Sequence, residues 1–98
     1  MAPEVDDLFD QMIGTLREAR QAVGNDFEVH TNTSPTDPDA LWRLASAVQS
    51  FAEQADGLLN MMIKRDPLNP TIREVEDLLD FFHQIEMQIG AVIEAGRG

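Results

Sequence analysis

Apolar residues recur at alternating intervals of four and three along most of this chain, which is the spacing of one face of an α-helix. The first such stripe predicts a helix over residues 3–23, with Pro3 in its first turn and Gly24 and Asn25 as a stop signal. Its apolar positions are Val5, Phe9, Met12, Leu16, Ala19 and Val23.

Two further stripes predict helices over residues 38–64 and 70–95. Each follows a Pro-x-Asx-Pro sequence, in which Asp37 or Asn69 caps the helix and the second proline occupies its first turn. The short Pro67–Pro70 stretch leaves room only for a tight reversal, so these two helices should form an antiparallel hairpin. Their stripes consist of Leu41, Leu44, Val48, Phe51, Ala55, Leu58 and Met62, and of Ile72, Val75, Leu79, Phe82, Ile89 and Ile93.

Between the first two helices, residues 24–37 lack apolar periodicity and are predicted to form a polar linker. Phe27 and Val29 alternate as in a strand, but a single short strand would have no partner, so we expect a loop that tucks both side chains against the bundle. A connection of this length is also where a small protein could hold a binding loop. The predicted fold is an all-α three-helix bundle, in a single domain over residues 1–98.

The composition indicates a folded chain, and the net charge limits the classes of molecule that it is expected to bind. Of the 98 residues, 43% are hydrophobic, and 18 acidic against 7 basic residues give a formal charge of −11. This charge repels nucleic-acid phosphates and anionic membranes and favours basic partner surfaces, so we expect neither nucleic acid nor a membrane as a direct partner. The acidic amino terminus has no apolar signal region, which makes the cytoplasm the expected location and leaves non-classical secretion open.

The most suggestive chemical pattern is the pair Asp80 and His83, with Glu76 and Glu86 one turn to either side, a spacing that di-metal helical bundles use. At about 100° per residue, His83 lies roughly 100° from the centre of the apolar arc and Asp80 lies farther still. Metal ligands in a bundle must point inward, so this pattern predicts a solvated acidic face and no metal site.

No other group of residues predicts catalysis. His30 stands in the predicted linker near Asp26 and Ser34, where no rigid scaffold would align a nucleophile with a base. The chain has no cysteine and no glycine-rich phosphate loop. We therefore expect a protein without catalytic residues, metal or cofactor.

The predicted helix lengths suggest a binding partner. Residues 38–64 and 70–95 would form helices roughly 40 Å long, longer than the helix over residues 3–23 can cover, which predicts a homodimer or a hetero-complex that buries the uncovered end. Trp42 lies about 150° from its helix's apolar arc, where it either covers Phe27 or Val29 or anchors an interface. The interface candidates are Trp42, Leu58, Leu59, Met61, Met62, Ile63, Phe81 and Met87.

The start of the second predicted helix also resembles a known family. Its Pro-Thr-Asp-Pro turn, the helix that follows and the closing Ile-Lys-Arg-Asp resemble the Pro-x-Asn-Pro turn and helix of type III secretion needle subunits, over about a third of the chain. The residues that carry the likeness are Pro35 to Leu41, Ser46, Val48, Phe51 and Ile63 to Asp66. Those subunits stop after this helix whereas this chain continues through another, so the resemblance implies a role in a secretion apparatus without implying polymerisation.

The leading prediction is a small acidic, non-enzymatic protein–protein interaction module, an adaptor, chaperone or inhibitor that acts through its helix faces. One alternative is a helical component of a bacterial secretion system or another assembly. A second is an inhibitor whose acidic helix mimics nucleic acid in a basic groove.

Overall fold

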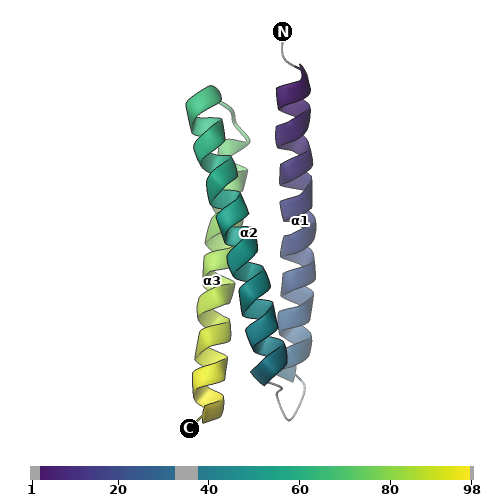
Figure 1. The fold of residues 1–98 in the computed structure, drawn as a ribbon, viewed down its shortest axis with the longest axis vertical. Helices are drawn as coiled ribbons and strands as arrows, with labels where there is room; N and C mark the ends of the chain where they lie inside the picture. Colours follow the sequence, from purple (N-terminus) through teal and green to yellow (C-terminus); the bar gives the residue numbers. More distant parts are fainter. Residues whose placement is uncertain (1–2, 33–37, 98) are drawn as a thin grey trace.

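Three long helices account for nearly all of the computed structural model, which describes the backbone of residues 3–32 and 38–97 and the side chains of residues 8–32 and 38–95. Helix α1 spans Pro3–Asn32, α2 spans Pro38–Arg65 and α3 spans Ile72–Arg97. Helices α1 and α3 run in one direction and α2 runs in the other, side by side in a rod of 56 × 18 × 17 Å (Figure 1). The predicted all-α three-helix bundle is confirmed.

Helix α1 continues past its predicted end at Val23, so the prediction of a linker is wrong for residues 24–32. Phe27 falls four residues after Val23 and packs against the core, which extends the apolar face of α1 through the Gly-Asn stop signal. The Thr31 hydroxyl then donates to the carbonyl oxygens of Phe27, at 2.9 Å, and Glu28, at 3.1 Å, within the same helix. Tertiary packing has overridden the local stop signal. The rest of the predicted linker, residues 33–37, lies outside the described residues, as does the cap predicted at Asp37.

The hairpin of α2 and α3 is covered by α1 up to its closed end. Helix α1 has 30 residues, against 28 in α2 and 26 in α3, so the prediction that the hairpin outreaches the first helix is wrong. Phe9 and Ile13 of α1 line one recess together with Met62 at the end of α2 and Asn69 in the turn. Leu58 and Met62 at this end are therefore covered within the chain, whereas Met61, Ile63 and Leu68 remain exposed.

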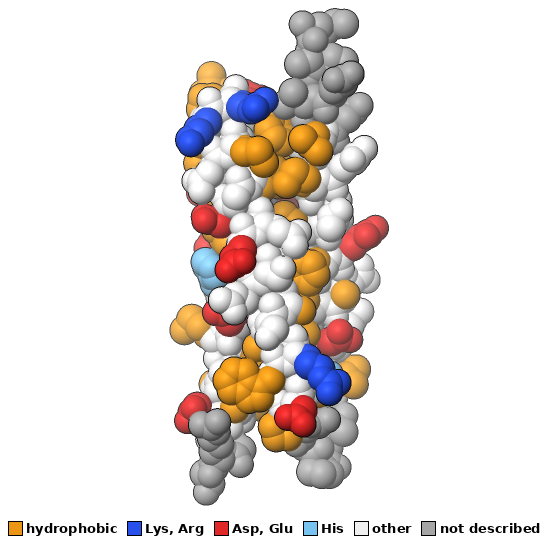
Figure 2. Space-filling model, viewed as in Figure 1, with side chains coloured by type: hydrophobic (Ala, Val, Ile, Leu, Met, Phe, Trp, Pro, Cys, Tyr) orange, Lys and Arg blue, Asp and Glu red, His pale blue; other side chains and the backbone are white. Residues whose placement is uncertain are grey.

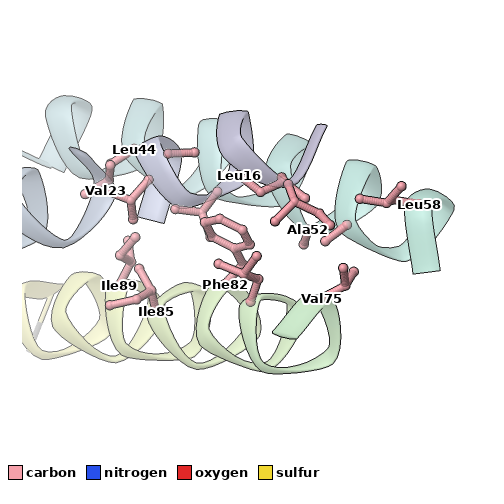
Figure 3. Packing of buried hydrophobic residues seen from close by; sticks show 14 of the residues in the cluster. Leu16, Val23, Leu44, Ala52, Leu58, Val75, Phe82, Ile85 and Ile89 are labelled. Carbon is pink, nitrogen blue, oxygen red and sulfur yellow. The ribbon is translucent and has the colours of Figure 1, made fainter. Parts of the chain in front are cut away.

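The core runs through the rod between all three helices (Figure 3). Phe82 of α3 points between α1 and α2 and has no exposed surface, and its ring centroid lies 5.7 Å from that of Phe51 and 5.6 Å from that of Phe81. No polar or charged residue is buried in the described part of the chain. The free energy of folding therefore comes mainly from apolar burial. The largest fully buried side chains are Phe82, Ile13, Leu16, Leu41, Leu58, Met62, Leu78, Ile89, Val48 and Val75.

The turn between α2 and α3 follows the predicted capping chemistry. The side-chain oxygen of Asn69 accepts a hydrogen bond of 2.9 Å from the backbone N–H of Thr71, which confirms Asn69 as the cap. The carbonyl oxygen of Asn69 accepts a hydrogen bond of 3.1 Å from the backbone N–H of Ile72, which is three residues later, the spacing of a 3₁₀ turn. This tighter first turn explains why α3 begins at Ile72 rather than at residue 70.

Candidate functional site

A groove between α2 and α3 is the best candidate for a functional site. It has a volume of about 270 Å³ and lies between the first half of α2 and the last turns of α3. The residues that line it are Trp42, Ala45, Ser46 and Gln49 of α2 and Glu86, Gly90, Ile93 and Glu94 of α3.

Small residues keep this groove open. A β-carbon built on Gly90 would meet no atom within 4 Å, so α3 leaves a gap at that position. On α2, the groove is lined by the short side chains of Ala45 and Ser46, which fill little of it. Of the lining residues, Trp42 is 54% exposed and Ile93 is buried. The groove therefore combines apolar lining with a large, half-exposed aromatic side chain.

The groove is acidic. Glu86 and Glu94 lie one helical turn before and one turn after Gly90, so two carboxylates flank the gap. The described residues that line the groove include no lysine or arginine. On the face in Figure 2, basic side chains lie near the two ends of the rod, whereas acidic ones are spread along the middle and the lower end.

The placement of Trp42 bears on its two interpretations. More than half of the side chain is exposed, and the ring lines the groove with residues of α3. Phe27 instead packs against the core from α1, and Val29 is 60% exposed. The structure thus places Trp42 beside α3 in the groove, while Phe27 and Val29 belong to α1.

The structure separates the other interface candidates. Leu58 and Met62 are 0% exposed and belong to the core, which corrects their selection as surface contacts, because α1 covers this end of the hairpin. Leu59 and Phe81 are partly buried, and the guanidinium carbon of Arg20 lies 5.0 Å from the centroid of the Phe81 ring. The candidates that remain accessible besides Trp42 are Met61, Ile63 and Met87.

The sequence reasoning missed Gln49, Gly90 and Glu94 as groove residues. A glycine inside a predicted helix was the available signal at Gly90. That Gly90 and Trp42 line one groove depends on how α2 packs against α3.

The histidines occupy positions without a metal-binding geometry. His83 and Asp80 are both exposed on α3, as the helical wheel predicts. His30 is partly buried within α1, so its prediction as a loop residue is wrong. Across residues 8–32 and 38–95, no three His, Asp or Glu side chains are grouped to hold a metal ion.

An ion pair joins α1 to α3 away from the groove. Arg17 donates from Nη2 to Oε1 of Glu74 at 2.6 Å and from Nε to Oε2, a two-bond pairing of guanidinium and carboxylate. The hydrogen bond from Arg17 lowers the pKa of Glu74, and the same bond raises the pKa of Arg17. Both side chains are solvent-accessible, so the pair fastens two helices and forms no enclosed site.

No helix in the described part of the chain is both long and apolar enough to cross a lipid bilayer. No protein-family model, no curated protein and no solved structure matches this chain.

Proposed function

We propose that this protein is a small acidic, non-enzymatic interaction module, an adaptor, chaperone or inhibitor, that binds another protein through the groove beside Trp42. The observation that carries the proposal is the half-exposed Trp42 at the edge of an open groove. Tryptophan is enriched among the residues that dominate binding energy, because its large ring removes much surface from water when a partner covers it.

The rest of the molecule supports this assignment. The groove lies on two helices that are held together by a continuous apolar core, so Trp42 is presented on a rigid scaffold. In the described residues, no titratable side chain is buried, whereas catalytic groups commonly depend on burial to shift their pKa values. Both features favour binding over chemistry.

A Trp42→Ala variant tests the proposal. We expect the wild-type protein to retain a partner from an extract of its host, and the purified partner to bind the variant at least tenfold more weakly, as loss of a central aromatic contact predicts. Leu8→Ala is the matched control, because Leu8 is a large hydrophobic residue of α1 that is 49% exposed and does not line the groove.

Thermal unfolding must accompany the binding measurement. Because Trp42 is more than half exposed, its variant should unfold within a few degrees of the wild type. Equal partner affinity for the wild type and Trp42→Ala would refute the proposed role of the groove.

A further inference from the structure

We propose that the groove beside Trp42 receives an arginine side chain from a basic segment of the partner, with the guanidinium held against the indole ring and between Glu86 and Glu94. This inference rests on the proposed function and adds the chemistry of the partner to it.

The groove is large enough to take one long side chain, since its volume is about 270 Å³. A β-carbon at Gly90 would meet no atom within 4 Å, so a long, narrow group fits beside α3 there, in the groove that Ile93 also lines. The three-carbon stem of arginine would pack on these apolar atoms while its charged end stays near the carboxylates.

The chemistry of the lining selects a planar cation. A guanidinium stacks on the face of an aromatic ring and donates to carboxylates, whereas an ammonium is a compact, strongly hydrated charge. Trp42 supplies the ring, and Glu86 and Glu94 supply carboxylates on either side of Gly90. The formal charge of −11 would also attract a basic segment at long range.

The same charges argue against a second copy of this chain as the occupant. A symmetric dimer that paired the two grooves would bring Glu86 and Glu94 of one copy against the same residues of the other. Carboxylates of like sign disfavour such a contact. The groove is therefore complementary to a basic partner and not to itself.

Trp42 reports directly on this site, because it is the only tryptophan and the chain has no tyrosine. The probe is an amphipathic helical peptide with leucine on one face and arginine on the other, and its control has citrulline, a neutral group of the same shape, in place of each arginine. We expect the arginine peptide to change the Trp42 emission to saturation, and the citrulline peptide to bind at least tenfold more weakly.

Two double variants separate the groove from general charge attraction. Glu86→Gln with Glu94→Gln should weaken binding of the arginine peptide at least tenfold. Glu18→Gln with Glu76→Gln removes the same number of charges from exposed positions outside the groove and should weaken it less than threefold. Equal losses in the two double variants, or equal binding of the two peptides, would overturn the inference.

A third variant blocks the groove without removing charge. Gly90→Leu should remain folded, since the position opens onto empty space and leucine favours helix more than glycine does. It should abolish the emission change. An unaltered response to the arginine peptide would contradict the inference, as would an emission change on dilution of the protein alone, which would assign the groove to self-association.

The outcomes distinguish this inference from the proposed function. If a host partner depends on Trp42 but binds the Glu86→Gln and Glu94→Gln double variant as tightly as the wild type, the interaction module stands and the arginine chemistry fails. If no partner depends on Trp42, the proposed function itself fails.

Discussion

Arg17 and Glu74 connect α1 to α3 through side chains that both remain in contact with solvent. Their two hydrogen bonds have the geometry of the stronger class of ion pairs, yet solvent screening keeps the contribution of an exposed pair small. Phe82 illustrates the opposite case, since it has no exposed surface and packs against two other phenylalanines. At the residue scale, apolar contacts provide most of the stability of the fold, and the ion pair adds a small contribution that depends on pH.

The Arg17–Glu74 pair should stabilise the protein at neutral pH and lose this effect in acid. Arg17 lowers the pKa of Glu74 below its ordinary value of 4.5, so the folded protein holds this proton less tightly than the unfolded chain. The contribution is therefore present above that ordinary value and disappears as the pH falls through the lowered, folded-state pKa. We expect Glu74→Gln to have a slightly lower melting temperature than the wild type at pH 7. The two melting temperatures should become equal once the pH is low enough to protonate Glu74 in the folded protein.

Melting curves from neutral to acid pH measure this difference. Glu76→Gln serves as the control, because it removes a carboxylate from the same helix outside the pair. A deficit of Glu74→Gln that stays constant through the acid range would show that Arg17 does not act on the ionised form of Glu74.

Helix α1 shows how tertiary contacts settle the length of an element. Gly24 and Asn25 read locally as a helix end, yet they lie inside a helix that continues to Asn32. Gly24 also faces α3, since a β-carbon built there would lie 3.9 Å from Cζ of Phe81. That distance is an ordinary van der Waals contact, so a methyl group fits without displacing the ring.

Replacing Gly24 with alanine distinguishes a helix interior from a helix end. Within α1 the substitution should raise the free energy of unfolding by about 0.5–1 kcal/mol, because alanine loses less backbone entropy than glycine on entering a helix. At a left-handed stop position, alanine would instead lower stability. Urea denaturation provides the measurement.

Gly57→Ala is the matched control for that experiment. Gly57 lies in the interior of α2, and a β-carbon there would meet no atom within 4 Å, so alanine should stabilise the protein by a similar amount. A gain at Gly57 combined with a loss at Gly24 would contradict the continuous α1 helix.

As a whole molecule, the chain closes its own core. Helix α1 reaches the closed end of the hairpin, and Leu58 and Met62 are buried there without any partner chain. The sequence predicted a homodimer or a hetero-complex from an apolar end left uncovered, and the structure covers only part of that end, since Met61, Ile63 and Leu68 stay exposed there. Any association with another molecule is then a property of the surface, and the groove beside Trp42 is the surface that we propose for it.

A self-contained core predicts a melting temperature that does not depend on protein concentration. Association that binds only the folded state would raise this temperature as the concentration increases. We expect melting temperatures to agree within experimental error over a fiftyfold range at micromolar concentrations. A steady rise across that range would indicate that folding is coupled to self-association.

Local signals were sufficient for much of the architecture. Helical periodicity identified the three helices, Asn69 and Pro70 marked the turn, and the wheel position of His83 placed it on the surface. Each of these features depends on neighbours within a few residues, because capping and the 3.6-residue repeat are local properties of the backbone.

Only the tertiary structure decided how far α1 extends, which apolar residues are covered at the hairpin end, and that Trp42 and Gly90 line one groove. These features depend on the register between helices that are distant in sequence. The sequence alone determined a three-helix bundle with an acidic surface. The candidate binding site appeared only when packing brought an exposed aromatic ring on α2 beside a gap on α3.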